Sequence, residues 1–208
     1  MRRTKVQSEQ TRREILDAAR AVFADHGVAR TSLEHIARAA GVTRGAIYWH
    51  FANKAELFAA MREQVHVPLV DQTDFALLQR AEDEDPLDAV ERFLIALIDG
   101  ALNDERTRAT FEIVSMKCEY VDEFADERSR QARHCEELRR KLATRYAAAR
   151  DAGTLADEVT PDLAAVDTSI FVIGVLRLAL LEQDERLTPR RLRTLVRAHV
   201  ASRRRRPR

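Results

Sequence analysis

The chain has 208 residues and a net charge of +1; 45% of its residues are hydrophobic, 33% are charged, and only 6 are glycine and 5 proline. These values indicate a soluble globular protein with one sizeable core or two small ones, and they exclude disordered, collagen-like and linker sequences. The longest nearly apolar run, residues 170–181, is shorter than the roughly 18 to 20 residues that cross a bilayer, so we expect no membrane span.

The first two predicted elements are short helices. Apolar residues recur with the helical period from Ile15 to Phe23, and Gly27 follows as a stop signal. Thr31 and Glu34 have the spacing of a capping box, which predicts a second helix behind them.

Two further helices are expected before the middle of the chain. Gly41 ends the second helix, and Thr43 is expected to cap a third that contains the sequence RGAIYWHF. Asn53, followed by Glu56, indicates the cap of a fourth helix over about 54–81.

The later helices are marked by proline. A side chain able to cap a helix stands directly before a proline in three places, where the missing N–H group costs nothing. We therefore expect helices to begin at Asp85-Pro86, Thr160-Pro161 and Thr188-Pro189. One or two more should lie within 104–150, and no segment alternates like a strand, so the expected fold class is all-α.

The second and third helices have the form of a helix-turn-helix motif. In the third helix, Ile47 and Phe51 can satisfy the core, because they stand four residues apart. The polar and ring side chains then remain outside, and such a surface suits the major groove of B-DNA, which admits the N-terminus of a helix. These side chains are Thr43, Arg44, Tyr48, Trp49 and His50.

Each of these residues has an expected role at DNA. Arg44, beside the bare backbone of Gly45, is the best candidate for reading a base edge, because its planar fork can bind guanine O6 and N7 together. Trp49 could pack on a sugar or a thymine methyl group. Alternatively, Tyr48 and Trp49 fill the seam with the fourth helix, and His50 is an ordinary surface imidazole. Phosphate contacts are expected from Thr43, Tyr48, His50 and Lys54, and from Thr31 with the N-terminus of the second helix.

Three stretches carry a resemblance to a known family: RRTK, TRREILDAARAVFADHGVARTSLEHIARAAGVTRGAIYWHFANKAELF and MKCEYVDE. They resemble the TetR family of bacterial repressors, in particular the AcrR-like regulators of multidrug efflux pumps, with a much thinner match in the C-terminal half. The resemblance implies a homodimer with about nine helices per subunit, which binds a near-palindromic operator and is released by a small molecule. It divides the chain into a helix-turn-helix DNA-binding domain (1–52) and a helical ligand-binding and dimerisation domain (53–202).

The penultimate helix supports a dimer independently. It is apolar almost all round, since one face carries Val172, Val175, Leu176, Ala179 and Leu180 while Phe171 and Leu178 lie elsewhere. This helix and the last helix therefore need apolar partners on two sides. The core of the same subunit can cover one side, and the same two helices of a second chain can cover the other, which forms a four-helix bundle. A monomer that buries both sides remains an alternative.

The resemblance also implies a ligand pocket between the fourth helix and the helices that contain FEIVSMKCEY and SIFVIGVLR. Its residues are more apolar than those associated with relatives, so a small hydrophobic or aromatic effector is expected. Arg177 interrupts the apolar run, either at the rim of this cavity or as an arginine of the dimer interface. The other matching positions are Val65, His66, Leu69, Phe111, Ser115, Ser169, Val172, Ile173 and Leu176.

The charge is unevenly distributed along the chain. Residues 1–66 carry 11 Lys or Arg against 7 Asp or Glu, whereas residues 67–202 carry 19 against 27. The basic N-terminal part (1–66) beside an acidic remainder predicts a polyanionic partner for residues 1–66. The alternative is that both parts are ordinary solvated surfaces. The final arginines are expected to form a basic disordered tail over 203–208, with nonspecific attraction to DNA as the other possibility.

Other functional classes have little support in the sequence. Cys118 and Cys135 fit a reducing cytoplasm, and acids beside Cys118 disfavour a reactive thiolate. We expect no metal, no cofactor and no catalytic residue, because metal-ligand spacing, phosphate loops and nucleophile motifs are missing. The alternative functions are a DNA-binding protein without an effector, a repressor of a metabolic operon that senses a lipid or aromatic metabolite, and a helical enzyme that kept the fold.

Overall fold

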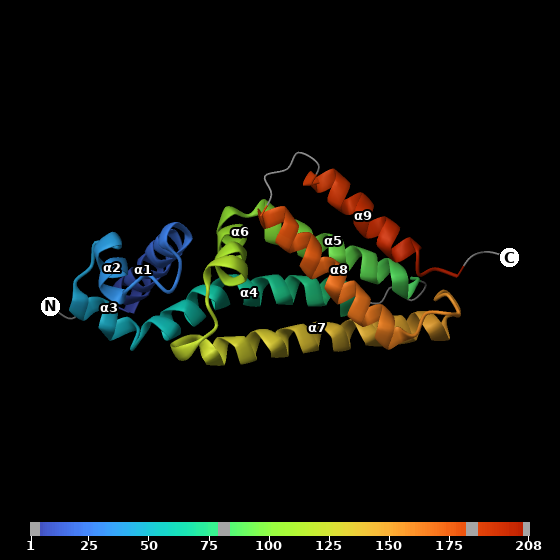
Figure 1. Cartoon of the computed structure of the whole chain (residues 1–208), viewed down its shortest axis with the longest axis horizontal. Helices are drawn as coiled ribbons and strands as arrows, with labels where there is room; N and C mark the ends of the chain where they lie inside the picture. The colour runs from blue at the N-terminus through green and yellow to red at the C-terminus, as the bar shows by residue number, and fades with distance from the viewer. Residues whose placement is uncertain (1–4, 79–83, 182–186, 206–208) are drawn as a thin grey trace. The chain divides into compact units, whose positions relative to one another are not determined.

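The computed structural model describes residues 5–78, 84–181 and 187–205, without the side chains of 67–76 and 78. Within these residues the chain forms nine α-helices and no strand, which confirms the predicted all-α fold (Figure 1). A π-helical turn and a 3-10 turn separate the sixth and seventh helices. The elements are α1 (Lys5–His26), α2 (Leu33–Ala39), α3 (Arg44–His50), α4 (Lys54–Leu78), α5 (Pro86–Asn103), α6 (Glu105–Glu112), η1 (Ile113–Lys117), η2 (Asp122–Phe124), α7 (Ala125–Asp151), α8 (Pro161–Leu181) and α9 (Pro189–Ala201).

The chain divides into two compact units. Unit 1 comprises Met1–Val67 and Glu105–Arg128, and unit 2 comprises Pro68–Asp104 and Ser129–Arg208. Unit 1 is larger than the DNA-binding domain expected over 1–52, because its core extends beyond α1–α3. The start of α4 and the segment around η1 join that core through Leu57, Phe58, Met61, Ile113, Val114 and Phe124.

Local signals in unit 1 define the ends of α1, which has 22 residues, and of the much shorter α2. Gly27 and Gly41 adopt φ values of 78° and 65°, which few residues with a side chain tolerate, and they end α1 and α2 as expected. The predicted cap of α2 is wrong by one residue. Ser32 is the N-cap, since its side chain accepts a hydrogen bond from the His35 N–H group (3.2 Å), whereas the Thr31 hydroxyl donates to the Gly27 carbonyl (2.8 Å).

In unit 2, α8 and α9 both pack against α5 (Figure 1). All three helices begin at the predicted X-Pro pairs. The Asp85 carboxylate accepts from the Leu87 N–H group at 2.9 Å, and the Thr160 and Thr188 hydroxyls accept from backbone N–H groups at 3.4 Å. The sequence therefore predicted these starts correctly.

Helix α8 is long and apolar enough, by length and composition, to cross a membrane. The apolar run at 170–181 is shorter than a membrane span, but the helix that contains it begins at Pro161 and is therefore long enough. One face of α8 is buried within unit 2, including Thr168, Val172, Leu176 and Leu180. We therefore interpret α8 as a core helix of unit 2 and not as a membrane span; its exposed face is also apolar.

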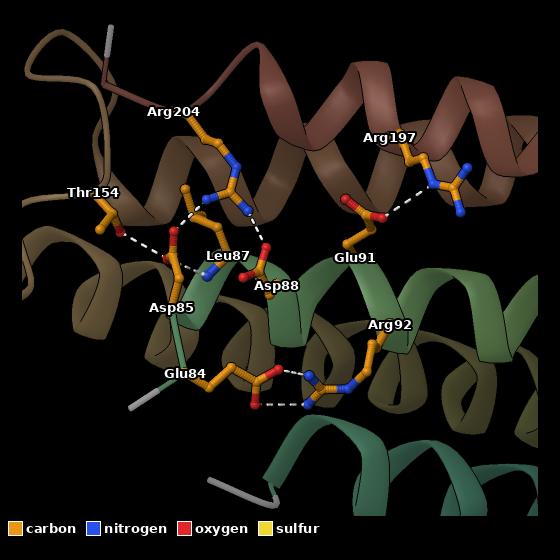
Figure 2. A network of polar contacts seen from close by, with 9 residues as sticks. All are labelled: Glu84, Asp85, Leu87, Asp88, Glu91, Arg92, Thr154, Arg197 and Arg204. Carbon is orange, nitrogen blue, oxygen red and sulfur yellow. Dashed lines mark hydrogen bonds and ion pairs between the residues drawn. The ribbon is translucent and has the colours of Figure 1, made fainter. Parts of the chain in front are cut away.

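Residues 203–205 are ordered, which corrects the predicted disordered tail over 203–208 at these three positions. Arg203 is buried and pairs with Asp167, while Arg204 pairs with Asp85 and Asp88 at the start of α5 (Figure 2). The backbone is held as well, since the Arg205 N–H group donates to the Thr154 carbonyl at 2.8 Å. The arginines are ordered because acids far away in the sequence neutralise them; residues 206–208 lie outside the described chain.

Candidate nucleic-acid interface

Helix α3 is anchored from one side and exposed on the other. Ile47 and Phe51 are buried in the core of unit 1, as predicted. On the opposite side, Tyr48 is 42% exposed and Trp49 is 72% exposed. The exposure of Trp49 excludes the alternative that its ring fills the seam with α4, so α3 does present ring side chains to solvent.

The N-terminus of α3 is open to a partner. Thr43 caps it, since its hydroxyl accepts a hydrogen bond from the Ala46 N–H group at 3.2 Å. The Arg44 side chain is 75% exposed. A side chain built onto Gly45 would meet no atom within 4 Å, so the backbone there is accessible. This combination allows a close approach by a base edge.

Glu34 of α2 holds two side chains of α3. Its Oε1 accepts a hydrogen bond from the Tyr48 hydroxyl (3.0 Å) and lies 3.4 Å from the Arg44 Nε. The Arg44 guanidinium also lies over the Tyr48 ring, 5.6 Å from its centroid. Hydrogen bonds from its own backbone N–H group, and then from Tyr48, lower the pKa of Glu34 below its usual value, so the carboxylate is charged at neutral pH.

Lys54, at the start of α4, has a partner that the sequence did not predict. Its Nζ lies 3.1 Å from Glu123 Oε1 and 5.4 Å from the centre of the Phe124 ring. Lys54 and Glu123 line a shallow depression of about 300 Å³ together with Glu34 and Tyr48. A phosphate that binds Lys54 would therefore compete with Glu123.

Two other predicted phosphate contacts have different surroundings. Thr31 is buried, and its hydroxyl is already bound to Gly27, so its position does not support a direct phosphate contact. The neighbouring Ser32 is exposed. His50 is half-buried, with its ring 4.6 Å from that of Trp49 in an edge-on arrangement.

The residues of the predicted ligand pocket fall into both units. In unit 1, Val65 is buried, His66 and Phe111 are half-buried and Ser115 is exposed. The side chain of Leu69 lies outside the described residues. On α8 of unit 2 the positions divide between the two faces: Ser169, Val172 and Leu176 are buried, whereas Ile173 and Arg177 are exposed.

A buried arginine that sequence reasoning missed connects three helices of unit 1. From α1, the Arg20 Nε donates to Thr110 Oγ1 of α6 (2.9 Å), and its Nη2 donates to Gln64 Oε1 of α4 (3.1 Å). Its Nη1 binds Asp17 at 2.8 Å. No local signal identifies this residue, because two of its partners are 44 and 90 positions away.

Cys118 is half-buried. Its neighbouring acids were expected to keep the thiol protonated. Burial, with a further contribution from Glu127, raises the pKa of Cys118 to about 12. Glu127 itself forms a buried ion pair with Arg62, 2.8 Å between Oε2 and Nη1. Cys118 is therefore a thiol at neutral pH, which agrees with the expected absence of a reactive thiolate.

The capped helix α3, with its exposed arginine, aromatic rings and open backbone, defines a helix-turn-helix DNA-binding protein. Residues 15–61 match the bacterial regulatory proteins of the tetR family, and residues 85–199 match the C-terminal region of MAATS-type transcriptional repressors. The chain belongs to the TetR family of transcriptional regulators.

Curated relatives and solved structures agree with this assignment. The HTH-type transcriptional regulator TtgR of Pseudomonas putida is 38% identical over 185 residues, which cover 88% of this chain and 87% of TtgR. The structure of NalD, the secondary repressor of the MexAB-OprM multidrug efflux pump in Pseudomonas aeruginosa, matches with a TM-score of 0.83 and 32% identity, covering 97% of this chain and 99% of NalD. The SmeT–triclosan complex matches with a TM-score of 0.76 and 34% identity, covering 93% of this chain and 91% of SmeT.

Proposed function

We propose that this chain is a cytoplasmic repressor that binds a near-palindromic operator and controls a multidrug efflux pump. The observation that carries DNA binding is the exposed surface of α3, where Arg44, Tyr48 and Trp49 surround the open backbone of Gly45. Control of efflux is supported by the roles of two similar proteins, NalD and SmeT; SmeT is the repressor of the Stenotrophomonas maltophilia multidrug efflux pump SmeDEF.

Within this proposal, the phosphate contacts come from residues around α3 and the start of α4. Ser32 replaces Thr31 as the hydroxyl beside the N-terminus of α2, because Ser32 is exposed and Thr31 is buried. Thr43, His50 and Lys54 are proposed to keep their expected roles as phosphate contacts, with Lys54 exchanging Glu123 for a phosphate oxygen. Tyr48 is not among them, because its hydroxyl already donates to Glu34.

The proposed active form is a homodimer formed through the last two helices. Apolar residues on α8 follow one another at intervals of three and four, and so form an exposed stripe along one helix face. A second copy can cover it in a four-helix bundle, with the two α3 helices meeting successive major grooves about 34 to 36 Å apart. Arg177, also exposed, then lies at the interface. The stripe consists of Leu163, Val166, Ile170 and Ile173, with Leu181 at the helix end; α9 has an exposed apolar residue of its own, Leu195.

The proposed effector is a small hydrophobic or aromatic compound. Its class is supported by the apolar side chains among the positions implied by family resemblance, such as Val65, Phe111 and Val172. SmeT, a similar protein, has been solved with triclosan. Release from DNA requires that the effector bind the DNA-free conformation more tightly, because a ligand with equal affinity for both states shifts nothing.

DNA selection tests this proposal. We expect the protein to enrich a two-fold symmetric site from random duplexes, and we expect hydrophobic drugs such as triclosan to raise the Kd for that site. Arg44→Ala should lose the sequence preference. Arg133→Ala, which removes the same charge from an exposed position on α7, should retain it.

Each outcome of this experiment has a defined meaning. If the protein enriches no sequence, the proposed repressor function is contradicted. Enrichment that no compound in a panel of drugs, lipids and aromatic metabolites reverses supports a DNA-binding protein without an effector. Reversal by a metabolite alone points instead to a metabolic operon.

A further inference from the structure

Glu34 places a negative charge within the surface proposed to meet DNA. The side chain is bound by the α3 residues Arg44 and Tyr48 and lines the depression beside them. A carboxylate here repels phosphates, which lowers the affinity for any duplex. Attraction to DNA therefore does not account for an acid at this position.

The contacts of Glu34 leave one edge of Arg44 available. The carboxylate lies 3.4 Å from the Nε of Arg44, on the side of the guanidinium away from the edge formed by the two terminal nitrogens. Those nitrogens form the fork that binds guanine O6 and N7. The guanidinium also lies over the ring of Tyr48, 5.6 Å from its centroid, so the fork has a second neighbour on α3.

Glu34 is itself held by a contact from α3. Its Oε1 accepts a hydrogen bond from the Tyr48 hydroxyl at 3.0 Å. An exposed arginine without such a support would have to lose its rotamer freedom when it binds a base, and that loss weakens binding.

We propose that Glu34 is a specificity-determining residue that orients the base-reading fork of Arg44 while it repels phosphates. The repulsion acts on every duplex, whereas the orientation helps only where Arg44 meets its base. Glu34 therefore raises the ratio of operator affinity to nonspecific affinity. This inference rests on the proposed function, in which Arg44 reads a base edge.

The test compares Glu34→Gln with the unmodified protein on the selected operator and on a scrambled duplex at several salt concentrations. Glutamine keeps the size and an oxygen acceptor but removes the charge. We expect tighter binding to the scrambled duplex and a roughly three- to tenfold fall in the ratio of the two affinities. Asp25→Asn, which removes a charge from an exposed position on α1, should leave that ratio unchanged.

A double-mutant cycle separates orientation from general electrostatics. In an Arg44→Ala background, Glu34→Gln should no longer change the affinity ratio, because the residue that it orients is missing. An unchanged ratio for Glu34→Gln alone, or a full fall that persists without Arg44, would overturn the inference while the proposed function stands. If the unmodified protein does not discriminate between the duplexes, the proposed function fails together with the inference.

Discussion

Arg44 and Lys54 carry the same charge, yet their surroundings predict different effects on DNA binding. Arg44→Ala is expected to cost about 1–3 kcal/mol on the operator and to relax its sequence preference, because a base contact is lost. Lys54→Ala should weaken all duplexes similarly and reduce the salt slope by at most about 1, because Glu123 already holds the ammonium group. Titrations at several salt concentrations measure both effects; equal behaviour of the two variants would contradict the assignment of roles.

His199 gives unit 2 a predicted dependence on pH. Its ring stacks on Phe171 with centroids 3.9 Å apart, and its Nε2 lies 3.0 Å from Thr168 Oγ1. Burial lowers the pKa of His199 from 6.5 to about 4. The unfolded chain therefore binds a proton first as the pH falls, so the free energy of unfolding decreases between these two values and then levels off.

The size of this effect is moderated by solvent. Because the imidazole of His199 is only partly buried, we expect a loss of about 1–2 kcal/mol rather than the full value of the shift. Urea unfolding from pH 7 to pH 4 measures it, and His199→Gln should flatten the curve. Carboxylates with lowered pKa values, such as Asp17, lose their stabilising contribution only below this range. A flat curve for the unmodified protein would rule out the effect.

Single residues also show how far local sequence reasoning extends. The outward position of Trp49 was predictable, because Ile47 and Phe51 already satisfied the core. The cap of α2 was not, because Thr31 and Ser32 both stand at positions that suit a cap. The choice depends on the turn at Gly27, whose carbonyl accepts the Thr31 hydroxyl. That turn is itself held by a distant contact, the hydrogen bond from the Val28 N–H group to the Lys117 carbonyl (2.9 Å), so the sequence spacing alone could not decide between them.

At the level of elements, a substitution of Arg20 tests how strongly its hydrogen bonds fix α1 to α4 and α6. Arg20→Met removes three hydrogen bonds and leaves Gln64 and Thr110 without their guanidinium partner. We expect the free energy of unfolding to fall by about 2–4 kcal/mol, measured from urea midpoints. Arg30→Met, at an exposed position of unit 1, is the control and should change it by less than about 0.5 kcal/mol. Equal midpoints for the two variants would contradict the structural role of Arg20.

Helix starts and helix irregularities differ in how well the sequence predicts them. The starts of α5, α8 and α9 depend on adjacent residues, such as Asp85-Pro86, and were predicted correctly. The π-helical turn η1 was not predicted. Its end is fixed by a distant contact, a hydrogen bond from the Val28 N–H group to the Lys117 carbonyl (2.9 Å). Such pairing across the chain leaves no periodic signal.

At the level of the whole molecule, self-association depends on the exposed stripe of α8. Ile170→Glu should place a charge at its centre and yield a monomer in sedimentation velocity, with weaker operator binding, because burial of an unpaired carboxylate is unfavourable. Ile170 is 66% exposed, so the subunit fold should persist in circular dichroism. Val121→Glu, at an exposed apolar position of unit 1, should remain dimeric. A dimeric Ile170→Glu variant would place the interface elsewhere.

The ion pairs around Arg204 determine where the C-terminus of this protein can be truncated or tagged for expression. Arg203, Arg204 and Arg205 are neutralised by acids of their own subunit, as drawn for Arg204 in Figure 2, so these three arginines add little attraction for nucleic acid beyond that of residues 1–66. Truncation after Ser202 would strip the counter-ions from Asp85, Asp88, Asp157 and Asp167. A purification tag that replaces the chain from position 203 onward should thus lower the yield of folded protein, whereas a tag fused after Arg208 would leave the ion pairs of these acids in place.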